Sequence, residues 1–353
     1  MTNSVTGFLQ EGVRRRDALA TQIVIDEIEQ RHVAPACASR VRTTMPIERA
    51  SVRAMHKPWG VSDLQPWSDI DGTGDAVGEL WFERADKNAP VPALLLKLLF
   101  TSGPLSIQVH PDDTFARAMG MPNGKSEAWY TISAKSGAQI GIGLNRRVTP
   151  RELRASISNR SIVELVQWRS VAKGDVIFIP AGTIHALGAG IVLAEIQQRS
   201  DTTFRLFDYD RHRELHINNA VAVANAWPLP SPANPTRLTD ERTVLVASRH
   251  FVLERVDLQE ASSWALVAEP ETWILVLDGH AAIGLATVSI GQVVFVGGGR
   301  SSIEVGPNGL TALIAYPAAQ PIDSLLQRLC ELSTPLVQSA APADLIAHAK
   351  ART

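Results

Sequence analysis

The sequence is poor in cysteine and has no marked excess of either charge. Its 353 residues include two cysteines, Cys37 and Cys330, which stand far apart; such sparse usage favours a reducing compartment over a disulfide scaffold. The formal net charge is -2 and no strongly basic segment occurs, so the composition argues against nucleic-acid binding. Neither a secreted disulfide-rich domain nor a nucleic-acid-binding module is therefore expected.

Long apolar runs are missing as well. No stretch reaches the ~18–20 residues that a membrane helix needs, because the nearest candidate, residues 93–100, is interrupted by Lys97. The N-terminus has no apolar block of the signal-peptide type. With 45% hydrophobic and 20% charged residues, the chain has a globular composition, and its length predicts about two domains. We expect a cytoplasmic protein that does not bind a membrane.

Changes of pattern divide the chain. Apolar residues recur at loosely helical spacing before residue 46, and short β-rich runs follow. Thr149 with Glu152 three residues later predicts a helix over 149–168. Four prolines in residues 228–235 mark a linker. We predict a helical N-terminal extension over 1–45, a catalytic barrel domain with short helical insertions over 46–227, a second barrel domain over 236–320 and a helical C-terminal tail over 321–353.

A short internal repeat links the two predicted barrels. Residues 174–185 read Gly-Asp-Val-Ile-Phe-Ile-Pro-Ala-Gly-Thr-Ile-His, and they align with Gly-Gln-Val-Val-Phe-Val-Gly-Gly-Gly-Arg-Ser-Ser at residues 291–302. The turn glycine recurs, but Ser302 stands in place of His185. We therefore predict that the second barrel is structural and holds no metal. Chance similarity between two hairpins is the alternative.

Four side chains have the pattern of a metal site. Residues i and i+2 of a strand face the same side, so Gln108 and His110 would point to one spot. Glu127 adds a carboxylate, and His185 follows a strand closed by proline and a turn glycine. Two nitrogen and two oxygen ligands favour a four-coordinate ion such as Zn²⁺. The alternative is an ordinary hairpin with a core histidine and a barrel-lining glutamine.

Four charged side chains could act beside this site. Lys125 would face the cavity together with Glu127, where a lowered pKa would suit proton transfer, or it could be a solvated loop residue. Lys97 either reaches outward to solvent or faces an anionic ligand. Glu195 and Arg205 lie among apolar neighbours. They form either a structural ion pair or part of the site.

These segments together resemble the class I mannose-6-phosphate isomerases, the zinc-dependent cupin type, and especially their short bacterial form. The resemblance is strong over 57–217 and weaker as far as residue 316. Residues 1–45, and Val61 where the family often has a second glycine, depart from the pattern. The matching motifs are Lys-Pro-Trp-Gly at 57–60, Gly-Glu-Leu-Trp at 78–81, Leu-Ser-Ile-Gln-Val-His-Pro-Asp-Asp at 105–113, Gly-Lys-Ser-Glu at 124–127, Gly-Thr-Ile-His-Ala-Leu at 182–187, Gln-Arg-Ser-Asp-Thr-Thr-Phe-Arg at 198–205 and Arg-Glu-Leu-His-Ile at 213–217.

The resemblance implies a mainly-β fold of two cupin-like (double-stranded β-helix) barrels. It also implies a sugar-phosphate substrate and reversible isomerisation of mannose 6-phosphate and fructose 6-phosphate, by zinc-assisted proton transfer through an enediol intermediate. Carried over by matching position, the zinc ligands are Gln108, His110, Glu127 and His185; Arg205 is the catalytic arginine; Lys125 and Glu195 are both candidate bases; Lys97, near the phosphate, and Asp201 contact the substrate.

Two other functions are compatible with a cupin barrel. A non-catalytic sugar-phosphate-binding cupin would not need Lys125, Glu195 and Arg205 together. An iron-dependent cupin oxygenase would hold iron and consume oxygen, whereas the neutral amide of Gln108 suits a redox-inert ion better. The sequence is compatible with a monomer or a dimer.

Overall fold

The computed structural model describes residues 47–70, 74–228 and 234–329. The extension predicted over 1–45, most of the proline-rich linker, both cysteines and the tail from residue 330 lie outside these residues. The described residues belong to one compact unit. Strands far outnumber helices, and the mainly-β fold class predicted from the sequence is confirmed.

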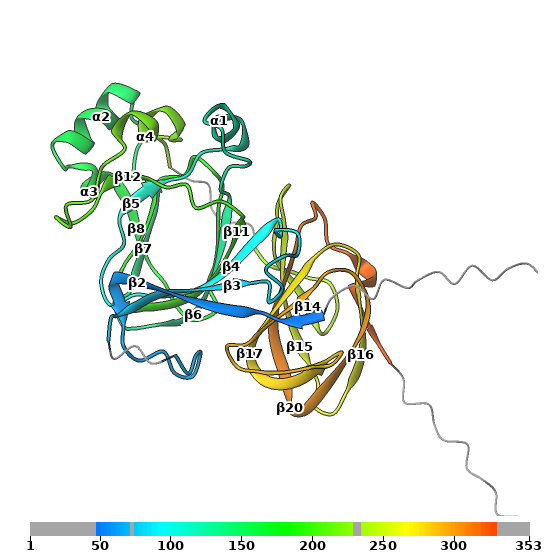
Figure 1. Cartoon of the computed structure of the whole chain (residues 1–353). Helices are drawn as coiled ribbons and strands as arrows, with labels where there is room; N and C mark the ends of the chain where they lie inside the picture. The colour runs from blue at the N-terminus through cyan, green and yellow to red at the C-terminus, as the bar shows by residue number, and fades with distance from the viewer. Residues whose placement is uncertain (1–46, 71–73, 229–233, 330–353) are drawn as a thin grey trace, which may run out of the picture. The chain divides into compact units, whose positions relative to one another are not determined.

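The first barrel consists of two antiparallel sheets that face each other (Figure 1). The six-stranded sheet has the order β2 (Ser51–Val61), β3 (Val77–Glu83), β4 (Leu94–Phe100), β11 (Ile191–Gln198), β6 (Glu127–Ala134) and β9 (Val176–Ile179). The five-stranded sheet has the order β12 (Phe204–Phe207), β5 (Ile107–Val109), β10 (His185–Leu187), β7 (Gln139–Leu144) and β8 (Val166–Ser170). Residues that are distant in the sequence therefore face one interior.

Strand β4 shows how the sequence builds both faces of this wall. All seven residues of Leu-Leu-Leu-Lys-Leu-Leu-Phe are buried, as expected of a strand covered on both sides. Leu96 and Leu98 share a core cluster with Trp273 of the second barrel, whereas Leu99 belongs to the cluster inside the first barrel. Because alternate residues face opposite sides, Lys97 points inward with Leu99. It does not reach outward to solvent.

Four short helices pack on the outer side of the five-stranded sheet: α1 (Asp113–Ala118), α2 (Pro150–Ser158), α3 (Ile162–Leu165) and α4 (Ile217–Val223). The capping box of Thr149 and Glu152 is confirmed, but the single helix predicted over 149–168 is wrong. Arg160 takes a left-handed φ of 70° after α2, and the chain becomes strand β8 because it pairs with β7. Of the described helices, none has the length and apolar character of a membrane span.

The second barrel is a ten-stranded sheet around its own apolar core. Its main path is β1 (Ile47–Arg49), β19 (Val293–Val296), β17 (Thr272–Ile283), β20 (Gly299–Tyr316), β15 (Val252–Leu258), β14 (Arg242–Ala247) and β13 (Thr236–Arg237). Strands β16 (Ser263–Ala268), β18 (Ala286–Ser289) and β21 (Leu326–Arg328) pair alongside this path. Strand β1 precedes the first barrel in sequence but pairs with β19, so the described chain starts in the second barrel's sheet.

The internal repeat corresponds to matching strands. Strands β9 and β19 take the same four places in the aligned segments. The glycines before them, Gly174 and Gly291, both have a positive φ, 91° and 77°, which is a conformation that favours glycine. The two barrels therefore use the same turn-and-strand unit.

The C-terminal tail begins differently from the predicted helix. Its described part is a 3-10 turn, η1 (Asp323–Leu325), followed by β21, which pairs with β16. Buried Arg242 forms an ion pair with Glu254 and donates hydrogen bonds to the carbonyls of Ile322 and Asp323. These tertiary contacts hold the segment as a turn and a strand, which the local sequence pattern did not indicate.

Candidate active site

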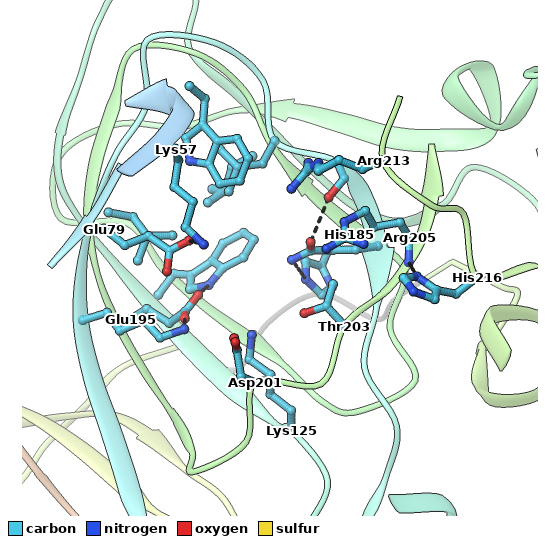
Figure 2. A pocket seen from close by; sticks show the side chains of 18 residues that line it. Lys57, Glu79, Lys125, His185, Glu195, Asp201, Thr203, Arg205, Arg213 and His216 are labelled. Carbon is cyan, nitrogen blue, oxygen red and sulfur yellow. Dashed lines mark hydrogen bonds and ion pairs between the residues drawn. The ribbon is translucent and has the colours of Figure 1, made fainter. Parts of the chain in front are cut away.

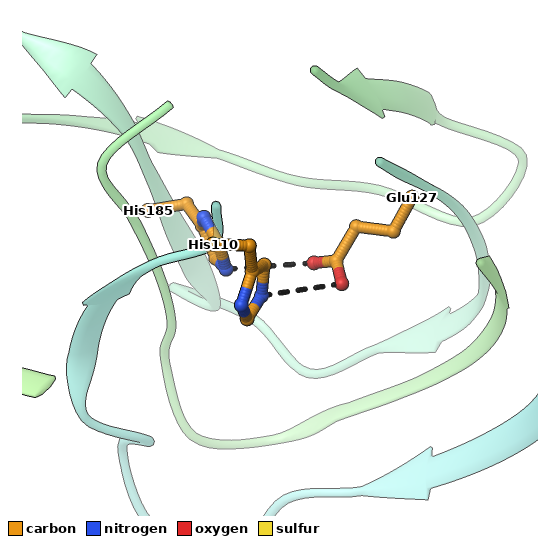
Figure 3. Close-up of side chains that lie close together, drawn as sticks. All are labelled: His110, Glu127 and His185. Carbon is orange, nitrogen blue, oxygen red and sulfur yellow. Dashed lines mark ion pairs between the residues drawn. The ribbon is translucent and has the colours of Figure 1, made fainter. Parts of the chain in front are cut away.

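Three potential metal ligands meet inside the first barrel. His110 follows β5, Glu127 begins β6 and His185 begins β10, and one ligand atom of each lies within 4.8 Å of the others. Nε2 of His110 is 3.3 Å from one oxygen of Glu127, and Nε2 of His185 is 3.4 Å from the other. Figure 3 shows both rings directed at the carboxylate. All three side chains are buried.

Backbone carbonyls orient the two imidazoles. Nδ1 of His110 lies 2.9 Å from the carbonyl oxygen of Thr202, and Nδ1 of His185 lies 2.9 Å from that of Thr183. Because a carbonyl only accepts, each Nδ1 donates its proton and each Nε2 presents a lone pair. Burial lowers the pKa of both rings, and the charge of Lys125 adds to the effect on His110, whose pKa falls to about 3. Both imidazoles are therefore neutral at pH 7, the form that binds metal.

The lone pairs of two imidazoles thus face a buried carboxylate. Lys125 forms an ion pair with one oxygen of Glu127. Beyond this pair and the contacts of the two histidines with the carboxylate, the Glu127 oxygens and Nε2 of His110 have no hydrogen-bond partner. Buried polar atoms without partners are costly, and a divalent cation between these three residues would satisfy all of them. Two imidazole nitrogens and a carboxylate oxygen form a donor set that zinc accepts. The residues present therefore fit the metal implied by the sequence.

Gln108 reaches the same place from the neighbouring strand. It is the register partner of His185 across β5 and β10. Its amide nitrogen lies 3.2 Å from Nε2 of His185, while its oxygen accepts a hydrogen bond of 3.0 Å from the Ser106 hydroxyl. Half a turn of the amide would present the oxygen to the cluster. The structure therefore brings all four predicted ligands together, with the amide nitrogen of Gln108 turned inward.

Two rows of register partners, one in each sheet, line the barrel interior at and beside this cluster. In the five-stranded sheet the row is Arg205, Gln108 and His185. In the six-stranded sheet the row is Trp81, Lys97, Glu195 and Trp129. Register partners lie side by side across a sheet, so each row sets its side chains at one depth in the barrel. Apart from Trp81, all of these residues border a cavity of about 250 Å³.

Glu195 is held at both of its oxygens. Nζ of Lys97 lies 2.9 Å from one oxygen, and the indole N–H of Trp129 donates to the other over 3.1 Å. Lys97 also lies over the ring of Trp81, 4.5 Å from its centroid. Lys97 is therefore a buried, paired cation, and the partner of Glu195 is Lys97. The structural pair with Arg205 considered from the sequence is not found.

Lys125 also lies inside the barrel, with 4% of its surface exposed. Its Nζ is 3.0 Å from Glu127. Burial alone would lower the pKa of Lys125, but the charges of Glu127 and Glu195 outweigh burial, and the pKa lies above its ordinary value. The lowered pKa expected from the sequence applies to a lysine beside a bound metal, and it stays a prediction; around Lys125 as the structure has it, the carboxylates raise the pKa. Asp201 borders the same end of the cavity (Figure 2).

The opposite wall carries positive charge. Arg205 donates its backbone N–H to Nδ1 of His216 over 3.1 Å. Among the described residues, no carboxylate lies within ion-pair distance of its guanidinium. Arg213 shares the carboxylate of Asp208 with Arg211, so two positive charges face one negative charge. Figure 2 shows Arg205, Arg213 and His216 across the cavity from Glu79 and Glu195.

Several residues that border the cavity received no role from the sequence: Lys57, Trp59, Glu79, Arg213 and His216. Nζ of Lys57 lies 3.1 Å from Glu79, and the indole N–H of Trp81 donates to Glu79 over 2.6 Å. All five lie in sequence motifs that this chain shares with the isomerase family, but the family resemblance did not imply a role for any of them. Glu79 had one further signal, a charge within the buried run of β3, of the kind that drew attention to Lys97.

The sequence is similar to known isomerases, although no protein-family model matches the chain. A mannose-6-phosphate isomerase of Streptococcus mutans is 35% identical over 277 residues, which are 65% of this chain and 85% of the relative. Mannose-6-phosphate isomerase ManA of Bacillus subtilis is 40% identical over 144 residues, which are 39% of this chain and 45% of the relative.

Solved structures share the fold. The crystal structure of a mannose 6-phosphate isomerase from Bacillus subtilis has a TM-score of 0.68 at 24% identity and matches 77% of this chain and 99% of that chain. The apo form of the mannose 6-phosphate isomerase from Salmonella typhimurium has a TM-score of 0.61 at 15% identity, with 77% and 99% of the two chains matched. At these identities the similarity establishes the architecture alone.

The substitution Glu79→Gln tests the electrostatic coupling of the six-stranded wall. Burial alone would raise the pKa of Glu79, but the charges of Lys97 and Lys57 outweigh burial and lower it. A carboxyl group whose pKa falls on folding stabilises the fold above its unfolded pKa of about 4.3, and this contribution is lost as the pH falls through the folded value. Urea unfolding should therefore show Glu79→Gln to be less stable than the unmodified protein at neutral pH. The difference should shrink toward pH 4 and below; a difference that grows in acid would contradict the coupling.

Proposed function

The chain belongs to the family of mannose-6-phosphate isomerases and is an aldose–ketose isomerase that interconverts mannose 6-phosphate and fructose 6-phosphate; we propose that it does so on a zinc ion in the first barrel. The observation that carries this proposal is the convergence of His110, Glu127 and His185 on one point. Gln108 supports it from the next strand. We also propose a cytoplasmic location, which the sparse cysteine usage supports.

Zinc would be held by Nε2 of both histidines, the carboxylate of Glu127 and the amide oxygen of Gln108. When bound, zinc would polarise the sugar carbonyl and stabilise the negative charge that develops on its oxygen. The carbonyls of Thr202 and Thr183 fix both rings before any metal arrives. The site is therefore prepared for the ion, with little reorganisation required of the ligands.

We propose Glu195 as the base that carries the proton between C2 and C1 of the sugar. Its carboxylate borders the cavity, and Lys97 and Trp129 fix both of its oxygens. Trp129, which donates a hydrogen bond to Glu195, also lies beside the ligand cluster, with its ring 5.5 Å from that of His185. Glu195 is therefore next to the cluster but is not one of the proposed ligands. Lys125 is already paired with Glu127 at 3.0 Å. We propose that Lys125 donates a hydrogen bond to a sugar oxygen.

The phosphate group needs positive charge that the protein has not already balanced. The charge of Lys97, predicted to lie near the phosphate, is balanced by Glu195 at 2.9 Å. Arg205 and Arg213 border the opposite wall, and their planar guanidinium groups can bind phosphate through two hydrogen bonds each. We propose that these arginines hold the phosphate, that Lys97 positions Glu195, and that Asp201 accepts a sugar hydroxyl.

Removing a proposed ligand should remove both metal and activity. We expect Gln108→Ala and His185→Ala to weaken zinc binding by more than about 100-fold, and turnover of fructose 6-phosphate to fall with zinc content. Zinc is measured by elemental analysis and turnover by a coupled assay. The control is His280→Ala in the second barrel, which should keep both. An unmodified protein that holds iron and consumes oxygen, or that binds zinc without turnover above background, would contradict the proposed function.

Changing the proposed base should separate proton transfer from metal binding. We expect Glu195→Gln to lower kcat by about 10²–10⁴-fold while zinc content stays unchanged, since Glu195 is not a ligand. Proton exchange is followed by NMR in deuterated water, where the variant should no longer incorporate deuterium at C1 or C2. Lys125→Met is the comparison, and it should slow turnover but retain exchange. The reverse pattern would assign the base to Lys125.

The phosphate assignment predicts a loss that depends on the substrate. We expect Arg213→Met to lower kcat/KM for fructose 6-phosphate by about 10–100-fold, the usual effect of one charge-assisted hydrogen bond, and to leave the rate with unphosphorylated fructose unchanged. Lys97→Met should lower both, because Lys97 acts on Glu195. Arg237→Met, on an exposed pair in the second barrel, serves as the control. Equal losses with the two substrates in Arg213→Met would disprove the assignment.

A further inference from the structure

We propose that Gln198 is a positioning residue for the metal site. It ends strand β11, three residues after Glu195, and it is 8% exposed. It is not among the residues that border the cavity, so it acts through other residues. Its carboxamide ties together the chain segments that carry the proposed ligands; this inference rests on the zinc-dependent function proposed above.

The first connection of Gln198 is to the segment of Lys125 and Glu127. The side-chain oxygen of Gln198 accepts the backbone N–H of Ser126 over 2.9 Å. The backbone N–H of Gln198 donates to the carbonyl of Ser126 over 3.1 Å. Ser126 stands between Lys125 and Glu127 and is itself buried. Gln198 therefore fixes the peptide units from which these two side chains enter the barrel.

The second connection is to the segment that follows His110. The side-chain nitrogen of Gln198 donates to Oδ1 of Asp113 over 2.9 Å, and the same oxygen accepts the backbone N–H of Gly124 over 2.9 Å. Asp113 begins helix α1, three residues after His110. A Cβ on Gly124 would lie 2.4 Å from the backbone of Asp112. The two segments are thus in close contact, and the Gln198 amide bridges them.

The third connection reaches His185 through Ser126. The hydroxyl oxygen of Ser126 accepts the backbone N–H of Ala181 over 3.2 Å. The next residue, Gly182, donates its N–H to the carbonyl of His110 over 2.8 Å, and the turn then leads to His185. All three segments that carry histidine or carboxylate ligands are therefore joined, directly or through Ser126, to one carboxamide.

The chemistry of this junction requires an amide. Ser126 presents a donor and Asp113 presents an acceptor, so the side chain between them must accept on one side and donate on the other. Methionine has a similar length but supplies neither hydrogen bond. Glutamate could accept from Ser126, but its second oxygen would lie against the carboxylate of Asp113. Groups that orient metal ligands commonly change metal affinity by about 10–100-fold when removed.

The first experiment compares Gln198→Met with Gln292→Met. Gln292 also accepts a backbone N–H through its side-chain oxygen, that of Ser289 over 3.1 Å, but it lies in the second barrel. We expect Gln198→Met to weaken zinc affinity by about 10–100-fold, to shift the visible absorption bands of the cobalt-substituted protein, and to lower kcat more than it raises KM. Gln292→Met should leave all three unchanged. Unmodified zinc affinity, cobalt spectrum and kcat in Gln198→Met would overturn the proposal.

The second experiment tests for rescue. Gln198→Glu alone should impair zinc binding, because two carboxylates would meet where one hydrogen bond exists. Adding Asp113→Asn removes the repulsion between two charges, while the asparagine oxygen can still accept the N–H of Gly124, so the double variant should recover zinc affinity by at least about tenfold over Gln198→Glu, within the range of measured pair couplings. A merely structural role would give additive losses. Additive losses would therefore reject the proposal.

The third experiment separates this proposal from the proposed function. Hydrogen–deuterium exchange of the protein prepared with a chelator needs neither metal nor substrate. Gln198→Met should raise exchange over 110–116, 124–128 and 181–186, whereas Gln292→Met should leave these segments unchanged. Failure of the unmodified protein to bind zinc would count against the proposed function alone. Unchanged exchange in Gln198→Met would count against the junction alone.

Discussion

The buried carboxylate of Glu127 sets the requirements for the whole first barrel. One of its oxygens lies beside Nε2 of His110 and the ammonium of Lys125, and the other lies beside Nε2 of His185. A carboxylate so far from water is stable only where its surroundings supply positive charge or hydrogen bonds. The structure supplies one cation and orients two neutral nitrogen ligands, an arrangement that a second positive charge, a metal ion, would complete. The hydrogen bonds of Thr202 and Thr183 orient the two imidazoles toward Glu127, and those of Gln198 hold the segment that carries it.

The two facing sheets contribute side chains of different charge to the cavity. The row in the six-stranded sheet places the Lys97–Glu195 ion pair between two indoles, so the carboxylate of Glu195 is held rigidly. The opposite wall carries arginines in excess of carboxylates. A sugar phosphate that lies between them would meet fixed carboxylates at its reacting end and positive charge at its anionic end. In the proposed function, this polarity would determine how the substrate lies, because binding energy at the phosphate orients the atoms that react.

The second barrel contributes to this cavity indirectly. It repeats the turn-and-strand unit of the first barrel, but its core is apolar, and its sheet shares a cluster with the outer face of β4. A strand buried on both faces leaves a charged residue no route to solvent. Lys97 must therefore find its partner inside the first barrel, where Glu195 stands across the ladder. The covering sheet thereby fixes the pair on which the proposed base depends.

The sequence alone indicated the mainly-β class, the repeated unit, the capping box of α2 and the set of residues that could hold a metal, because local periodicity, turn residues and motif spacing encode these features. It did not indicate that Glu195 pairs with Lys97, that β1 joins the second barrel, that the helix predicted over 149–168 gives way to β8, or that Lys125 forms an ion pair with Glu127. Those outcomes depend on strand register and on charges that meet only in the folded chain. Local pattern determined which residues could carry the chemistry; tertiary pairing decided which of them stand together, since the energy of a buried charge depends on its neighbours in space and not in sequence.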